Sequence, residues 1–227
     1  SRIEQHVVRA HAMDKIEMLA RILQADGRGP TIVFCRTKRT AQKTSDDLFE
    51  RGFRAATIHG DLGQSAREKA LNDFKAGKSD VLIATDVAAR GIDIDGITHV
   101  INYQCPEDEK TYVHRIGRTA RAGAAGIAVT FVDWDELARW KMIDTALVLG
   151  LPEPVETYSS SEHLFEMLNI PAGSSGRMNK KSATPVDKPK SDRPKTDRVK
   201  SEKAVEPKKP AADRIKRERT RTKRISE

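Results

Sequence analysis

Three arginines and a histidine in one short segment are the residues best suited to bind a multiply charged phosphate. His114 precedes Arg115, Arg118 and Arg121, and no Asp or Glu occurs from Lys110 to Val132. On a helix, residues three or four apart share a face, so we expect the arginines to project together. Arginine donates two parallel hydrogen bonds and stays charged, which favours a phosphate ligand. The alternative is a solvated basic helix.

In the sequence TIVFCRTKR at residues 31–39, a second group of polar residues follows the apolar stretch at residues 31–35. We expect Ile32, Val33 and Phe34 to lie in the core, and Arg36 and Thr37 to begin the next helix.

In the sequence HGDLGQSAR at residues 59–67, Gly60 lies in a predicted tight turn and Gln64 begins a helix. Helix N-termini attract anions, so Gly60 and the first amides of this helix form a candidate phosphate site. Arg67 is equally suited to bind a phosphate or to form a structural salt bridge.

The segment ATDVAARGID at residues 84–93 combines acidic residues with Gly91. Its aspartates do not have the spacing of a calcium-binding EF-hand loop. One structural interpretation is a loop in which Asp86 caps a short helix.

These four segments resemble, in order, four motifs of the DEAD-box RNA helicases. The last segment, HRIGRTARAG at residues 114–123, matches the final motif of that family with one change, because Ala120 stands where the family has glycine. The resemblance covers residues Ile3 to Pro171. Four ordered matches are far more specific than any single short motif.

The resemblance implies a role for each residue in binding ATP or RNA. Arg118 and Arg121 are implied to be arginine fingers on the ATP γ-phosphate, with Asp93 on the ribose and Gly91 allowing close backbone approach. His114 and Arg115 are implied to link this domain to a partner domain or to neighbouring motifs. The residues implied to contact the RNA backbone are Arg36, Thr37, Gly60, Gln64, Arg67 and Thr85.

Two motifs of that family are not found in the 227 residues. The sequence contains neither the phosphate loop Gly-x-x-x-x-Gly-Lys-Ser/Thr nor Asp-Glu-Ala-Asp. In the family both belong to a first RecA-like domain, which holds the phosphates and magnesium. The chain therefore resembles the second RecA-like domain, and we expect it to be inactive alone.

Short apolar runs that alternate with amphipathic segments must position these motifs. The predicted strands are Thr31–Cys35, Ala55–His59, Val81–Thr85, His99–Tyr103 and Ala128–Val132. The predicted helices are Met13–Ala25, Lys38–Arg51, Gln64–Ala76 and Glu136–Leu149, the last three followed by a glycine. This alternation predicts an α/β fold, a parallel RecA-like sheet with helices on both faces. Trp134 and Trp140 are expected in the core or at an interface.

Charge divides the chain into a domain, residues 1–171, and a tail, residues 172–227. The 57 residues from Pro171 onward carry 19 Lys or Arg and 8 Asp or Glu, a net charge of +11, whereas the first 170 carry −3. Beyond Gly176 the tail contains no aromatic residue. This composition predicts a disordered tail that binds polyanions.

Cys35 and Cys105 are the only cysteines and have no Cys-x-x-Cys spacing. A disulfide framework and a zinc site are therefore disfavoured, no metal ligand is predicted, and inert thiols in a reducing cytoplasm are expected. No apolar run is long enough to predict a membrane span.

These features predict part of an ATP-dependent RNA helicase that unwinds short duplexes or remodels ribonucleoprotein. Its composition is similar to that of bacterial members of the RhlE type. Two other functions remain open: a non-catalytic RNA-binding or regulatory module, and a superfamily 2 translocase on DNA.

Overall fold

The computed structural model describes residues 2–178, which form one seven-stranded sheet. All six strand pairings are parallel, and the strand order is β3-β4-β2-β5-β6-β1-β7. The strands are β1 (Ile3–Ala10), β2 (Thr31–Cys35), β3 (Ala55–Ile58), β4 (Val81–Thr85), β5 (His99–Asn102), β6 (Gly126–Val132) and β7 (Val155–Thr157).

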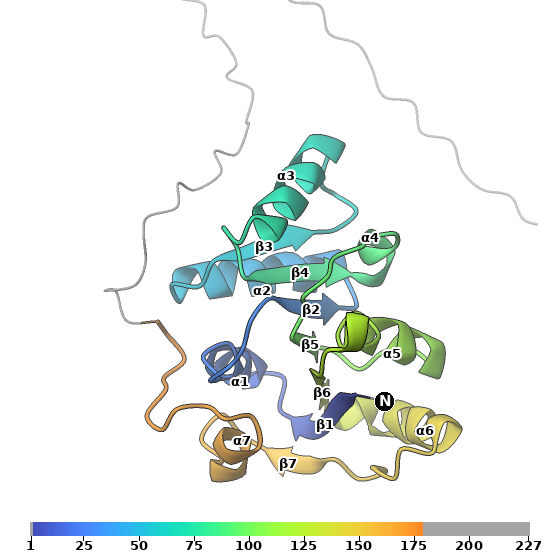
Figure 1. The fold of residues 1–227 in the computed structure, drawn as a ribbon. Helices are drawn as coiled ribbons and strands as arrows, with labels where there is room; N and C mark the ends of the chain where they lie inside the picture. Colours follow the sequence, from blue (N-terminus) through green and yellow to red (C-terminus); the bar gives the residue numbers. More distant parts are fainter. Residues whose placement is uncertain (1, 179–227) are drawn as a thin grey trace, which may run out of the picture. The chain divides into compact units, whose positions relative to one another are not determined.

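Helices cover both faces of this sheet (Figure 1). One face packs against α1 (Lys15–Ile22), α2 (Lys38–Glu50) and α7 (Glu162–Met167). The other face packs against α3 (Gln64–Lys75), α4 (Asp86–Ala89), α5 (Glu109–Ile116) and α6 (Leu137–Leu147). Two short 3₁₀ helices, η1 (Arg121–Gly123) and η2 (Trp134–Glu136), precede β6 and α6. The predicted α/β fold with a parallel sheet is confirmed.

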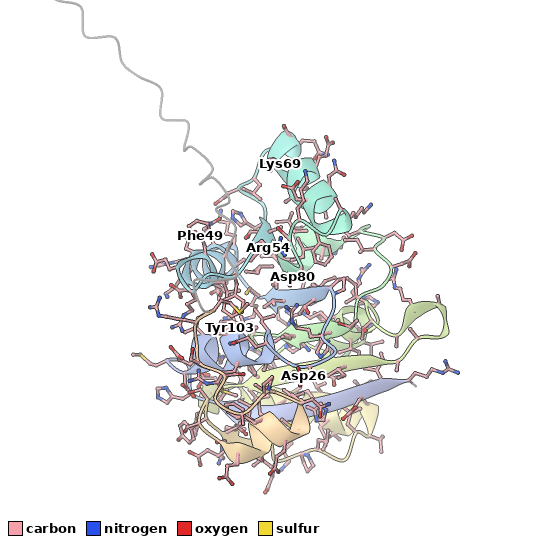
Figure 2. All side chains as sticks on the ribbon, turned by 60° about the vertical axis from the view of Figure 1, so that its left-hand side comes forward. Asp26, Phe49, Arg54, Lys69, Asp80 and Tyr103 are labelled. Atoms are coloured by element: carbon pink, nitrogen blue, oxygen red, sulfur yellow. The ribbon has the colours of Figure 1, made fainter. Side chains whose placement is uncertain are left out.

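Alternation along the buried strands explains how one sheet supports two cores. In β2, Val33 and Cys35 pack toward α1 and α2, whereas Ile32 and Phe34 pack toward α4. Tyr103, labelled in Figure 2, packs against the core that lies between the sheet and helices α1 and α2. Burial raises the pKa of the thiol of Cys35 to about 12 and that of Cys105 to about 12. Both cysteines are free and buried, as expected.

The sequence pattern located five strands and missed the two at one edge of the sheet, β1 and β7. The five predicted strands agree with the structure within two residues, and β1 and β7 were not predicted. Polar residues at Glu4, Gln5 and His6 interrupt the apolar pattern of β1. Strand β7 has three residues and, within residues 2–178, pairs with β1 alone.

The described chain continues past the predicted domain boundary at residue 171. Arg51 donates from Nη1 to the main-chain oxygen of Gly176 at 2.8 Å and accepts at its own oxygen from the Met178 amide at 2.9 Å. Gln24 donates to Ser175. Residues 175–178 thus contact Gln24, which follows α1, and the end of α2, so these residues pack on the domain beyond the predicted boundary. The predicted disorder of the tail concerns residues 179–227, outside the described part. No helix of residues 2–178 is long and apolar enough to cross a membrane.

Candidate functional site

Arg115 lies at the end of α5 and is fully buried, with 1% of its surface exposed. Its guanidinium donates to both carboxylate oxygens of Asp86, from Nε and Nη2, at 2.7 Å each. Its Nη1 donates to the main-chain oxygen of Gln104 at 2.9 Å and to Asn102 Oδ1 at 3.3 Å. The guanidinium carbon also lies 5.3 Å from the centre of the Phe34 ring.

The three arginines do not share one helical face, which corrects the prediction. Helix α5 ends at Ile116, and the chain then turns through Ala120 and Ala122, which have φ of 55° and 53°. These left-handed conformations cannot continue a right-handed helix. The left-handed residues flank Arg121 and place it off the axis of α5, whereas Arg118 already lies beyond the last residue of the helix.

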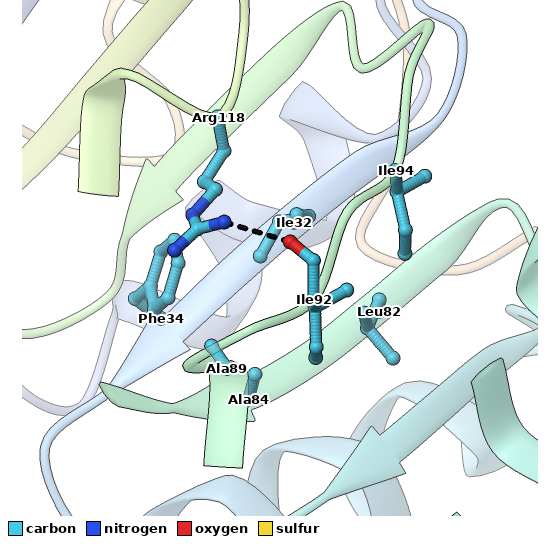
Figure 3. Close-up of a pocket in the computed structure, with 8 residues that line it drawn as sticks. All are labelled: Ile32, Phe34, Leu82, Ala84, Ala89, Ile92, Ile94 and Arg118. Carbon is cyan, nitrogen blue, oxygen red and sulfur yellow. Dashed lines mark hydrogen bonds between the residues drawn. The ribbon is translucent and has the colours of Figure 1, made fainter. Parts of the chain in front are cut away.

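Arg118 lies over an apolar surface formed by β2, β4 and the segment after α4 (Figure 3). Its Nη1 donates to the main-chain oxygen of Ile92 at 2.7 Å. Burial lowers the pKa of this guanidinium, the nearby charge of Arg121 lowers it further, and Asp93 opposes both effects. Two guanidinium groups are thus close enough to repel each other, and an anion placed between them would relieve this repulsion.

Arg121 forms an ion pair with Asp93, with 2.7 Å between Nη1 and Oδ1. The side chains are 33% and 85% exposed, so ligands can reach both partners. Gly91, two residues earlier, has φ +71°, a conformation that side chains other than glycine rarely adopt. The residues predicted to bind nucleotide are therefore brought together, and they offer two cations for phosphates and one carboxylate for hydroxyl groups.

An open hollow of about 80 Å³ adjoins this group. Its lining includes His114, Arg115 and Arg118, together with Arg90 and Asp86. His114 is exposed at this position. Arg90 and Arg118 are the accessible cations at this hollow, and they suit an anionic ligand.

The residues predicted to contact RNA follow the carboxyl ends of three neighbouring strands, β3, β4 and β2. Thr37 is the N-cap of α2 and accepts from the Thr40 amide at 3.1 Å. Arg36 is half-buried, its Nη1 is 3.4 Å from Glu136 Oε1, and its amide donates to Gln104 Oε1 at 2.8 Å. In parallel α/β sheets, ligands bind beyond this edge.

The turn and helix after β3 are accessible, as the predicted phosphate site requires. Gly60 and Gln64 are exposed, and the N-cap of α3, Gly63, provides no side-chain cap for the first amides of the helix. Arg67 donates to the main-chain oxygen of Ala88 at 2.9 Å. Arg67 is therefore bound to α4 through a backbone oxygen. This bond is not the salt bridge considered from the sequence, and the phosphate contact stays a prediction.

Thr85 ends β4 and is 8% exposed. It is also the N-cap of α4, although its side chain makes no capping hydrogen bond. The interpretation of Asp86 as the cap was wrong, because Asp86 is the first residue of α4 and its carboxylate binds Arg115.

Sequence reasoning missed two residues that hold the site together, Gln104 and Glu136. Glu136 is 4% exposed and lies next to Arg36 and Lys15, and its Oε2 accepts from the Asp133 amide at 3.0 Å. The one signal in the sequence was the pattern Asp133-x-x-Glu136, a capping box, which the structure contains. Trp140 is buried, and Trp134 is 41% exposed beside Arg9.

Comparison with known proteins identifies relatives of this arrangement. Residues 14–123 match the helicase conserved C-terminal domain family. The chain is 50% identical over 142 residues to a Listeria monocytogenes protein named ATP-dependent RNA helicase CshA. The match covers 63% of this chain and 27% of that protein. The chain thus spans about a quarter of the length of this relative.

Two solved structures are similar to this chain in both fold and sequence. The E. coli DEAD-box protein SrmB, bound to regulator of ribonuclease activity A, is 31% identical with a TM-score of 0.62, over 71% of this chain and 92% of that one. S. cerevisiae Dbp5, bound to RNA and ADP BeF3, is 32% identical with a TM-score of 0.63, over 74% and 44%.

Proposed function

Because this chain belongs to the DEAD-box family of RNA helicases, as a C-terminal helicase domain, we propose that it is the second RecA-like half of an ATP-dependent RNA helicase. The proposed helicase separates short RNA duplexes or remodels ribonucleoprotein in the cytoplasm. The proposal rests on two contacts. Arg118 Nη1 donates to the main-chain oxygen of Ile92 at 2.7 Å, and Arg121 Nη1 lies 2.7 Å from Asp93 Oδ1.

On the nucleotide side, each residue has a role that its chemistry allows. ATP supplies the phosphoryl group, and we assign Asp93 to accept from its ribose hydroxyls. This ligand displaces Arg121 from Asp93, which frees the guanidinium for the γ-phosphate. Arg118 joins it there, and the two fixed cations stabilise the negative charge that develops during phosphoryl transfer.

On the RNA side, we assign Arg36, Thr37 and Thr85 to phosphate oxygens. The exposed turn at Gly60 and the open first turn of α3 at Gln64 provide backbone amides for a neighbouring phosphate. We assign Arg67 to the same RNA backbone, from its position on α3. These contacts read no base edge, so the proposed binding is indifferent to RNA sequence.

The remaining parts of the reaction belong to another domain. The chain contains no Gly-x-x-x-x-Gly-Lys-Ser/Thr loop and no Asp-Glu-Ala-Asp motif. We propose that an N-terminal RecA-like domain holds magnesium and the inner phosphates, and that ATP and RNA draw the two domains together.

We propose that the basic segment beyond residue 178 binds polyanions and tethers RNA close to the domain. Its excess of Lys and Arg favours phosphate contacts independent of sequence. Removal of this segment should therefore flatten the dependence of RNA affinity on salt concentration. Equal slopes with and without the segment would reject this role.

ATPase measurements on the full-length helicase test the proposed function. We expect turnover that RNA stimulates and DNA does not, and no turnover by the 227-residue chain alone. Stimulation by DNA would favour a DNA translocase. RNA binding by the full-length protein without any turnover would favour a non-catalytic module.

A further inference from the structure

Gln104 is the residue at which two arginines from distant motifs meet. Its side-chain oxygen accepts from the Arg36 amide at 2.8 Å. Its main-chain oxygen accepts from Arg115 Nη1 at 2.9 Å. Arg36 follows β2 on the proposed RNA side, and Arg115 precedes the turn that carries the proposed arginine fingers.

We infer that Gln104 is a positioning residue that fixes Arg36 relative to Arg115 and thereby couples RNA binding to nucleotide binding. The inference rests on the proposed function, because it assigns Arg36 to RNA. Neither the motif resemblance nor the family match gives Gln104 a role.

The hydrogen bond from Gln104 extends the pairing of β2 and β5 beyond the ends of both strands. The last registered pair is Phe34 with Asn102, and the Tyr103 amide then donates to the Phe34 oxygen at 3.0 Å. At the next step the side chain of Gln104 takes the place of a backbone acceptor. It therefore determines where the main chain of Arg36 leaves the sheet.

A second contact orients the far end of Arg36. Its guanidinium lies 3.4 Å from Glu136 Oε1, and Glu136 is buried. A side chain that is held at both its main chain and its guanidinium loses little freedom when it binds a phosphate. Gln104 provides the first of these two anchors.

On the nucleotide side, Gln104 contributes only its main-chain oxygen. Arg115 also binds Asp86 through two hydrogen bonds. A substitution of the Gln104 side chain therefore removes the anchor of Arg36 and leaves the Arg115 contacts in place. Because coupling between two sites is reciprocal, the loss appears as a weaker effect of nucleotide on RNA affinity.

The opposite ends of the same two strands offer a matched control. There the Gly29 amide donates to Thr98 Oγ1 at 2.8 Å, which links the residues before β2 and β5. Thr98→Val removes a hydrogen bond of the same kind, from a backbone amide to a side-chain oxygen, between the residues that precede the same two strands. Thr98 lies at the amino edge and is assigned to no ligand.

The experiment uses the full-length helicase with Gln104→Met, Gln104→Glu and Thr98→Val. The affinity for one single-stranded RNA is measured with a non-hydrolysable ATP analogue and with ADP, and the ratio of the two defines the coupling. Melting temperatures report stability. Gln104→Asn, one methylene shorter, replaces Gln104→Met if that variant does not fold.

We expect Gln104→Met to reduce the coupling ratio at least threefold. Gln104→Glu, which keeps the acceptor, and Thr98→Val should keep it within twofold. A lower melting temperature for Gln104→Met with an unchanged ratio would overturn the inference and leave the proposed function intact. A wild-type ratio of one would instead reject the proposed function on which the inference rests.

Discussion

The end of α5 and the turn that follows it, residues 117–123, both contribute arginines, yet the arginine of the helix is buried and Arg121 of the turn is exposed to ligands. Arg115 in the helix is 1% exposed and binds a carboxylate and two further oxygens. Arg121 in the turn is 33% exposed, and its carboxylate partner Asp93 is 85% exposed. Residues of one type in one motif can therefore have different roles, which burial and partners decide.

This difference has a physical consequence. Removing one partner of a buried ion pair leaves an unpaired group in the interior, which is strongly destabilising. Exposed ion pairs contribute about 0–1 kcal/mol, so the pair of Arg121 with Asp93 separates easily. Arg115 is suited to hold α4 and α5 together, whereas Arg121 is suited to exchange one anionic partner for another.

The largest expected effect concerns the turn. In the proposed full-length helicase, Arg118→Ala or Arg121→Ala should lower kcat roughly 10³-fold, because each removes a cation that we assign to the γ-phosphate. Steady-state ATPase assays at saturating RNA measure this effect. Arg54→Ala, at an exposed position in Figure 2, should leave kcat nearly unchanged. Near-normal turnover in both turn variants would refute their assignment.

The next effect concerns the helix. Arg115→Met in the 227-residue chain should lower the free energy of unfolding by about 3 kcal/mol, the lower end for a buried pair, since the Asp86 side chain is 31% exposed. Arg121→Met should lower it by less than about 1 kcal/mol. Urea denaturation measures both values. Equal losses would show that the two regions do not differ in the way described.

The smallest effect concerns the turn backbone. Ala120 has φ 55°, ψ 32°, a conformation that costs a non-glycine residue about 1–2 kcal/mol. Ala120→Gly should raise the free energy of unfolding by about 0.5–1 kcal/mol, after the greater flexibility of glycine in the unfolded chain is subtracted.

Ala124→Gly is its control, because Ala124 has φ −71° and gains nothing from glycine. It should destabilise the chain by about 0.5–1 kcal/mol. Loss of stability in both variants would contradict the account of the turn.

The sequence predicted much of this fold, because the five predicted strands are short apolar runs of the kind typical of buried strands. It failed where tertiary contacts decide. The turn at Ala120 could not be seen, since alanine does not favour a left-handed conformation. The ion pair between Arg115 and Asp86 joins residues 29 positions apart. Gln104 carries no motif, and only its position after β5 gives it two arginine partners.

The most direct test of the contrast between helix and turn compares two nucleotide ligands on the full-length helicase. ADP with aluminium fluoride mimics the transferring phosphoryl group, whereas ADP lacks it. For Arg121→Ala, we predict a loss of affinity of at least a hundredfold for ADP with aluminium fluoride and less than threefold for ADP, measured at saturating RNA. An equal loss for the two ligands would contradict the claim that the turn arginines act on the γ-phosphate.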